Sequence, residues 1–238
     1  MASVLVTGSA SGLGLNAAAQ LARGGHDVVV HARRADRLPA PPEGQSWAGA
    51  VVGDLSSLDE VRAVAAAAEE HGRFDAVIHN AGLLDVAGMI EVNIVAPFAL
   101  TALMTRPSRI IALSSSMHRG GAPDLTRMAR GNASYSDTKL WVTALIMAFA
   151  ERWPDTLSHA VDPGWVPTRM GGAGAPDDLE AGHLTQTWLA TADDIEPRTG
   201  GYWHHRATQR PHAAALDRDF QRALVSALEE RTGLTLPA

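Results

Sequence analysis

The sequence contains no cysteine, which excludes both a disulfide framework and catalysis by a thiolate. No apolar run reaches the roughly 18 residues that a membrane-spanning helix needs. Residues 1–8 lack the basic and long apolar regions of a secretory signal peptide. Basic residues are outnumbered, with 20 Lys and Arg against 26 Asp and Glu, and the net charge of -6 argues against nucleic acid or an anionic membrane as a partner. These absences leave a cytoplasmic enzyme or binding protein as the expectation.

What the chain does contain is a regular alternation of short apolar runs and helical patterns. Its 238 residues, 46% of them hydrophobic, suffice for one core, and no linker-like run divides residues 1–238 into two domains. Strands are predicted at residues 3–7, 26–32, 46–52, 74–82, 108–115 and 157–164. Helices are predicted at residues 13–23, 57–72, 93–104, 135–151 and 217–231. This alternation indicates an α/β fold with a doubly wound parallel sheet in a single domain.

A glycine-rich loop, TGSASGLG, follows the first predicted strand at residues 7–14. In a doubly wound sheet, ligands bind beyond the carboxyl ends of the strands. Glycines let the backbone approach a phosphate closely, and the helix that follows offers free N–H groups and a positive dipole end. A flexible turn is the alternative, but the position between strand and helix favours a nucleotide site. The predicted cofactor-binding residues of this loop are Gly8, Ser9, Ser11, Gly12, Leu13 and Gly14.

Residues after the next three strands extend the predicted cofactor site. Arg33 and Arg34 stand where an NAD-preferring protein typically places an acid, and guanidinium groups suit a ribose 2′-phosphate, so we expect NADP(H) to be preferred over NAD(H). Solvated surface charges are the alternative for these two residues. Two further sets are predicted to contact the cofactor: Asp54 with Leu55, and Asn80 with Ala81 and Gly82. Their alternatives are an acid at a helix N-terminus and a simple turn.

Tyr135 and Lys139 lie four residues apart at the start of an apolar helix, so their side chains share one face. A nearby cation stabilises a phenolate and lowers the pKa of the phenol from its usual value of about 10. Such a phenol can give a proton to a carbonyl oxygen near neutral pH, while a serine from the preceding strand end holds the same oxygen. By itself the Y-x-x-x-K spacing is mostly structural; in this context it predicts a catalytic acid that acts on a carbonyl oxygen.

Together these motifs resemble the short-chain dehydrogenase/reductase family, of the single-domain type with a Rossmann fold, over nearly the whole chain. In family order they are TGSASGLG (7–14), DL (54–55), NAG (80–82), VN (92–93), SS (114–115), YSDTK (135–139) and PGWVPT (163–168). The resemblance implies reduction of a ketone or aldehyde to an alcohol, or the reverse oxidation. It also implies that Tyr135 is the general acid/base and that Lys139 lowers its pKa and binds the nicotinamide ribose. It further implies that Ser115 orients the carbonyl and Asn93 positions a water in a proton relay. It also implies cofactor contacts from Pro163, Gly164, Val166 and Thr168.

Some features separate this chain from the general family pattern. The spacing after the serines, the PGWVPT variant and the GGYWHH tail resemble the retinol-dehydrogenase-like branch. The stretch between Gly82 and Asn93 is shorter than in most members, and so is the helix that follows, which in many relatives builds a subunit interface. A homo-oligomer is therefore possible, with the usual interface in doubt. Residues 165–190 are expected to form a lid over the substrate pocket, which would take a small carbonyl or alcohol compound.

Competing functions are weighed against this interpretation. His204 and His205 are adjacent, but no spacing supplies a third ligand, so no metal site is expected. A nucleotide-binding sensor without turnover is the alternative function, although such a protein need not keep serine, tyrosine and lysine together. An epimerase or dehydratase of the extended family would carry a T-G-x-x-G-x-x-G loop and a larger substrate domain, and both are lacking.

Overall fold

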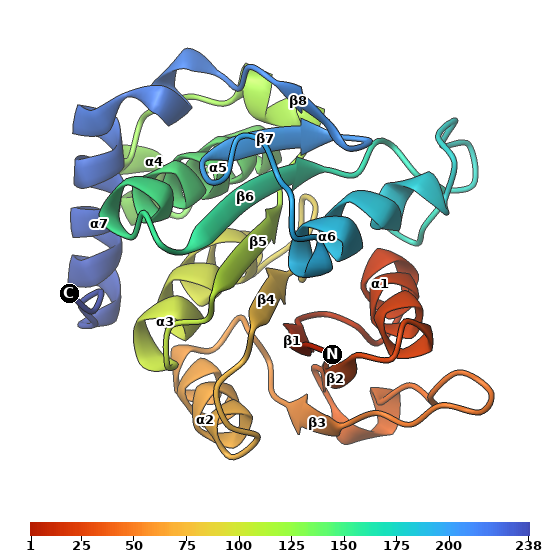
Figure 1. Cartoon of the computed structure of the whole chain (residues 1–238). Coiled ribbons are helices and arrows are strands. Elements are labelled where there is room, and N and C mark those ends of the chain that lie inside the picture. Colours follow the sequence, from red (N-terminus) through yellow and green to blue (C-terminus); the bar gives the residue numbers. More distant parts are fainter.

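The computed structural model describes the whole chain, residues 1–238, as one sheet covered by helices on both faces (Figure 1). The sheet has eight strands in the order β3-β2-β1-β4-β5-β6-β7-β8. The strands are β1 (Ser3–Val6), β2 (Asp27–Ala32), β3 (Gly49–Val52), β4 (Ala76–His79), β5 (Arg109–Leu113), β6 (Leu157–Asp162), β7 (Gly201–His204) and β8 (Ala207–Gln209). All neighbours are parallel except the β7–β8 pair. The predicted doubly wound parallel sheet is thus confirmed.

The strand order reverses between β3 and β4, because the chain returns past β1 to add β4 on its other side. The carboxyl ends of β1 and β4 therefore lie next to each other, with Val6 opposite Ile78 in the register. This is the switch point at which open α/β sheets bind ligands. The glycine-rich loop after β1 and the Asn80-Ala81-Gly82 turn after β4 meet there.

Two layers of helices cover the sheet. α1 (Gly12–Arg23) and α6 (Ala181–Thr191) pack together on one face, with Leu21 and Leu189 in a shared core with β1 and β5. The other face carries α2 (Leu58–Glu69), α3 (Ala96–Leu103) and α5 (Tyr135–Arg152). Short helical segments fill the connections: η1 (Ala35–Arg37), η2 (Glu91–Val95), η3 (Ser116–Gly120), α4 (Thr126–Arg130) and η4 (Ala213–Leu216).

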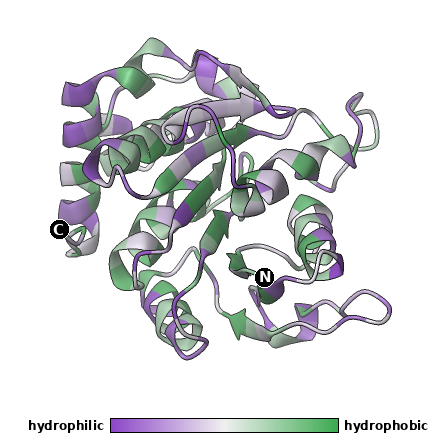
Figure 2. Cartoon of the chain, viewed as in Figure 1, coloured by the Kyte–Doolittle hydropathy of each residue, from purple (hydrophilic) through white to green (hydrophobic).

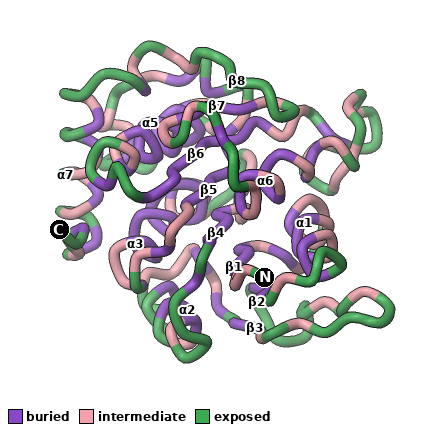
Figure 3. The backbone as a smooth tube through the Cα atoms, viewed as in Figure 1, coloured by how far each residue is buried: buried purple, intermediate pink, exposed green.

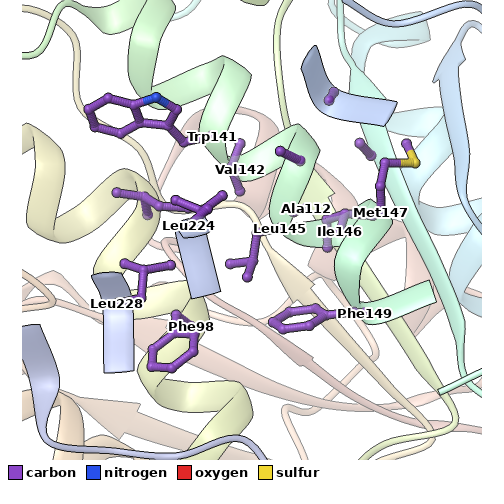
Figure 4. Packing of buried hydrophobic residues seen from close by; sticks show 14 of the residues in the cluster. Phe98, Ala112, Trp141, Val142, Leu145, Ile146, Met147, Phe149, Leu224 and Leu228 are labelled. Atoms are coloured by element: carbon purple, nitrogen blue, oxygen red, sulfur yellow. The ribbon is translucent and has the colours of Figure 1, made fainter. Parts of the chain in front are cut away.

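The last helix, α7 (Arg218–Thr232), closes the outer face of α5 (Figure 1). Its apolar stripe, predicted from the four-residue repeat of leucines, places Leu224 and Leu228 among Trp141, Leu145 and Phe98, all of them fully buried (Figure 4). Asp217 caps the helix by accepting from the backbone N–H groups of residues 219 and 220. α5 consequently has neighbours on both sides and carries little polar surface.

Hydropathy and burial both distinguish the interior of the sheet from its exposed edge and loops. Hydrophobic residues concentrate on the central strands and on the inward sides of the helices (Figure 2). The central strands are buried, whereas β8 and the loop around residues 38–46 remain largely exposed (Figure 3). Because they are buried on both faces, the parallel strands appear in the sequence as continuous apolar runs.

No helix of the protein combines the length and the apolarity needed to cross a membrane.

Several elements were not predicted from the sequence. α6, β7 and β8 were missed, and the strands predicted at 46–52 and 74–82 are shorter in the structure, at Gly49–Val52 and Ala76–His79. α6 packs against α1 on one side and against β4, β5 and β6 on another, so it has buried residues on most sides and shows no clear amphipathic stripe. The predicted lid at 165–190 accordingly divides into a loop up to residue 180 and this buried helix, and the lid proposal concerns the loop alone.

Candidate active site

The glycine-rich loop adopts a backbone that side chains would obstruct. Gly8 and Gly12 have φ values of +64° and +59°, in the left-handed region that favours glycine. A Cβ on Gly8 would lie 2.8 Å from the Cα of Ala81, and one on Gly14 would lie 2.3 Å from Nδ2 of Asn80. The loop after β1 and the turn after β4 therefore pack at a distance that only glycine permits.

Thr7 and Asn80 bind these two segments together. The Thr7 hydroxyl accepts the backbone N–H groups of Asn80 (3.0 Å) and Ala81 (3.1 Å). Asn80 Nδ2 in turn donates to the carbonyls of Thr7 (3.0 Å) and Gly8 (3.2 Å). Asn80 therefore has a structural role in addition to its predicted place in the cofactor site. Thr7, the first residue of the TGSASGLG motif, also belongs to the site, although the sequence analysis did not single it out.

The serines of the loop have different surroundings. Ser9 is fully buried, and its hydroxyl donates to the Val6 carbonyl (2.9 Å) and accepts the N–H of His31 (2.8 Å). His31 also accepts the N–H of Gly8 at Nδ1 (2.9 Å), which leaves Nε2 to donate to the Gly53 carbonyl (3.0 Å). Ser11 is exposed, and its hydroxyl does not cap α1. The backbone N–H of Ser9 also donates to the His31 carbonyl (3.0 Å), so both the N–H and the O–H of Ser9 are used inside the protein, whereas the Ser11 hydroxyl is available.

The two arginines after β2 differ in their partners although the side chain of each is 68% exposed. Arg34 makes two hydrogen bonds to the Asp36 carboxylate, at 2.9 and 3.0 Å. Arg33 Nε lies 3.9 Å from Asp54 Oδ2 and has no closer acidic partner. Arg33 therefore lies near Asp54, a predicted cofactor contact, whereas Leu55 is buried in the core and Arg34 is paired with Asp36.

Tyr135 and Lys139 come from the first turn and a half of α5, where Ser134 and Asp137 form a capping box. Lys139 Nζ lies 5.5 Å from the centroid of the Tyr135 ring, and it donates one hydrogen bond to the Leu113 carbonyl at the end of β5 (2.7 Å). Ser115, two residues beyond Leu113, is positioned by accepting the N–H of Met117 (3.2 Å). The predicted helix face and the predicted strand end therefore meet.

Asn93 lies in the π-helical turn η2, near Lys139 and Gly82. Its Nδ2 donates to the Leu83 carbonyl (2.9 Å) and to the Thr138 hydroxyl (3.0 Å), and its Oδ1 accepts the Leu83 N–H (2.8 Å). A Cβ on Gly82 would lie 3.5 Å from Asn93 Oδ1 and 3.6 Å from Lys139 Nζ. Gly82 thus leaves open the space beside the lysine, and Thr138 is a second positioning residue that the sequence analysis missed.

The expected direction of the Tyr135 pKa is wrong for the protein by itself. Burial is the main cause that raises the pKa of Tyr135 to about 12; the Ser115 hydroxyl opposes the shift, and the carboxylates of Asp162 and Asp85 add to it. Burial likewise lowers the pKa of Lys139 to about 8. The cost of removing the phenolate from water outweighs any attraction of the lysine, so the phenol keeps its proton.

The loop after β6 also approaches the glycine-rich loop. Thr168 Cγ2 would lie 3.6 Å from a Cβ on Gly12, and Val166 is buried against α6 near Gly182. Gly164 has a φ of +84° and donates its N–H to Oδ1 of Asp162 (3.1 Å). Of the four predicted contacts on this loop, Thr168 lies next to the glycine loop, Val166 and the Pro163 carbonyl lie near Gly182 of α6, and Gly164 approaches Asp177. Their contact with a cofactor stays a prediction. The charge of the buried Asp162 acts on Tyr135. The sequence analysis did not predict this role, because Asp162 lies outside the motifs that it used.

These features fit a nicotinamide dinucleotide. The positive-φ glycines and the exposed Ser11 at the N-terminus of α1 suit a pyrophosphate. The space next to Gly82 suits a flat group beside Lys139, two of whose three N–H groups remain after the bond to Leu113. These segments all lie at the carboxyl edge of the sheet, on both sides of the switch point.

Comparison with known proteins agrees with this geometry. Residues 2–178 match the short chain dehydrogenase family. Short-chain dehydrogenase chry4 of Gibberella zeae is 38% identical over 260 residues, covering 100% of both chains, and human retinol dehydrogenase 13 is 26% identical, covering 99% of this chain and 86% of the relative. The structure of a single-residue variant of actinorhodin polyketide ketoreductase with NADPH has a TM-score of 0.69 at 22% identity, covering 85% of this chain and 95% of that one, and shows the shared fold.

The fold and the site define an oxidoreductase that acts on CH–OH or C=O groups with a nicotinamide cofactor. The chain belongs to the short-chain dehydrogenase/reductase family, and its relatives include retinol-dehydrogenase-like members, as the sequence motifs predicted.

Proposed function

We propose that the protein is an NADPH-dependent carbonyl reductase, which reduces a ketone or aldehyde to an alcohol in a reversible reaction. The observation that carries this proposal is the meeting of Tyr135, Lys139 and Ser115 beside the space that Gly82 leaves open. NADPH, when bound, supplies the hydride. The chain supplies the proton and the means to hold the carbonyl oxygen.

The geometry supports a proposed role for each residue. The Tyr135 hydroxyl gives its proton to the carbonyl oxygen as the alkoxide forms, and the raised pKa of Tyr135 keeps that proton in place at neutral pH. The Ser115 hydroxyl, near the phenol, donates to the same oxygen. Lys139 places its remaining N–H groups toward the ribose, and the free lone pair of Asn93 Oδ1 accepts from a relay water.

NADPH oxidation followed at 340 nm with a panel of ketones and aldehydes tests the proposal. We expect turnover of at least one carbonyl compound, and oxidation of the corresponding alcohol with NADP⁺. Binding of NADPH without turnover of any compound in the panel would contradict it and support the sensor alternative instead.

The preference for NADPH depends, in this proposal, on Arg33. A charge-assisted hydrogen bond is worth about 1.5–3 kcal/mol, which corresponds to roughly tenfold or more at about 1.4 kcal/mol per decade. Arg33→Ala is expected to reduce the ratio of kcat/KM for NADPH to that for NADH by at least about tenfold, mainly through the KM for NADPH. Arg34→Ala is the matched control: it is equally exposed but paired with Asp36, so its effect should be several-fold smaller.

Steady-state kinetics with both cofactors measures this preference. Equal use of NADPH and NADH by the wild type would make both arginines simple surface charges, and an unchanged ratio in Arg33→Ala would exclude Arg33 as the source of the preference.

Three further expectations remain part of the proposal. The substrate is a small carbonyl or alcohol compound, the protein acts in the cytoplasm, and a homo-oligomer is possible, with the usual interface at the short helix after Asn93 in doubt.

A further inference from the structure

His118 is a fully buried histidine three residues beyond Ser115, and the proposed mechanism gives it no role. It lies in η3, the short helix for which Ser115 is the N-cap. The polar atoms of a buried side chain need partners, and a side chain that finds them holds those partners in fixed places. The partners of His118 therefore show which groups it can position.

Both ring nitrogens of His118 make hydrogen bonds to the backbone. Nδ1 lies 2.7 Å from the Ser115 carbonyl oxygen, and Nε2 lies 3.0 Å from the backbone nitrogen of His212. A carbonyl can only accept and a backbone N–H can only donate, so Nδ1 carries the proton and Nε2 accepts. Burial lowers the pKa of His118, in agreement with a neutral ring. One imidazole therefore connects the serine after β5 with the segment between β8 and η4.

The carbonyl of Ser115 accepts twice from the same residue. The backbone N–H of His118 reaches it at 3.0 Å and the ring Nδ1 at 2.7 Å, so both lone pairs are used. Ser115 is extended, with φ of -168° and ψ of 153°, and its Oγ accepts the N–H of Met117 at 3.2 Å. The direction of the carbonyl sets the course of the η3 turn that supplies this N–H. The imidazole therefore restrains the serine hydroxyl through the backbone.

The His118 ring is itself held by neighbours on other elements. It packs on Tyr202 of β7, which is fully buried, with 4.6 Å between the ring centroids. The next residue, Arg119, donates to the Arg210 carbonyl (2.8 Å) and to Gln209 Oε1 (3.2 Å). η3 is thus attached at two successive residues to the chain that follows β7, and the ring has a fixed base from which to hold the serine.

We propose that His118 is a positioning residue, which holds the Ser115 hydroxyl where it can donate to the carbonyl oxygen of the substrate. The inference rests on the proposed carbonyl reductase activity and adds a residue to it. The hydrogen bonds of His118 go to backbone groups, so its effect on catalysis passes through Ser115. Loss of the Nδ1 bond would leave the glycine loop unaltered and let the hydroxyl move, and a displacement of about 1 Å can cost about 10²-fold in rate.

A double-mutant cycle with the best ketone of the panel tests this inference. In the wild-type background, His118→Leu should lower kcat roughly tenfold or more, while the KM for NADPH changes less than about twofold. In the Ser115→Ala background, the same substitution should lower kcat less than about twofold, because the hydroxyl that His118 positions is already gone. Equal losses in both backgrounds would overturn the inference, and so would a Ser115→Ala variant that keeps the wild-type activity.

Two amide variants separate the hydrogen bonds and keep the test valid if His118→Leu fails to fold. The amide of Asn occupies the position of imidazole Nδ1 and can keep the bond to Ser115, whereas the longer Gln reaches the position of Nε2 and can keep the bond to His212. We expect His118→Asn to retain most of the wild-type kcat and His118→Gln to lose most of it. The reverse order, or equal kcat values in the two variants, would overturn the inference.

His159→Leu is the matched control, since His159 is also fully buried and hydrogen-bonded at both ring nitrogens. Its partners are the Arg198 carbonyl, the Gly201 N–H and the Trp203 indole, and none of these belongs to the site. It should lower the melting temperature but change kcat less than about twofold. A loss of kcat as large as that of His118→Leu would overturn the inference. Absence of turnover by the wild type with every carbonyl compound would reject the proposed function, whereas an active wild type with additive losses would reject this inference alone.

Discussion

Tyr135→Phe is expected to lower kcat for carbonyl reduction by a factor of about 10²–10⁴, the range typical for the loss of a positioned proton donor. Phenylalanine keeps the ring in its buried place at the start of α5 and removes only the hydroxyl that faces Ser115. The alkoxide that forms during reduction then has no phenol from which to take a proton. Steady-state kinetics with the best substrate of the panel measures the effect.

The affinity for NADPH distinguishes this role from a structural one. Its Kd, measured by the change in cofactor fluorescence, should stay within a few-fold of the wild-type value, because the glycine loop and Lys139 are untouched. Activity near the wild-type level in Tyr135→Phe would exclude the phenol as the acid, and a folding defect would appear as a lost cofactor signal.

Lys139→Met is expected to lower kcat/KM by roughly 10²-fold or more, the size of effect seen when one preorganised electrostatic donor is removed. The Lys139 ammonium lies 5.5 Å from the Tyr135 ring and beside the space at Gly82. Its loss takes away both a cation near the reacting groups and the donor proposed for the ribose. The Kd for NADPH should therefore rise together with the loss of turnover, unlike in Tyr135→Phe. An unchanged Kd would contradict the contact with the ribose.

The stability of Lys139→Met provides an independent readout. Burial lowers the pKa of Lys139 from 10.5 to about 8, so between these pH values the unfolded chain carries a proton that the folded protein has released. The free energy of unfolding of the wild type should consequently rise with pH across this window, by about 3 kcal/mol at about 1.4 kcal/mol per pH unit. Other titrating groups are common to both proteins, so the difference between wild type and variant isolates this gain.

Urea unfolding of both proteins at pH 7.5, 9 and 10.5 measures that difference. We expect the wild type to gain stability relative to Lys139→Met at each step. A constant difference would show that the lysine does not change its protonation on unfolding.

Local patterns in the sequence determined much of this protein. The alternation of apolar runs and helical patterns is enough to predict a parallel doubly wound sheet, because strands buried on both faces and helices buried on one leave different periodicities. The glycine loop follows β1 directly, and Tyr135 and Lys139 are one helical turn apart. These relations span a few residues, so backbone geometry alone brings the groups together.

Tertiary structure decided what depends on burial and on distant partners. The pKa of Tyr135 is raised because α5 begins inside the protein, and a charge pattern along the helix does not reveal that desolvation. The two arginines differ because Arg34 has Asp36 as a partner close in the sequence, while Arg33, after β2, approaches Asp54, which follows the neighbouring strand β3. α6 escaped prediction because the sheet and α1 bury it on several sides and remove the amphipathic signal. The sequence does not link Asp162 to Tyr135, because the effect of the buried Asp162 charge on the pKa of Tyr135 depends on separations in space and not along the chain.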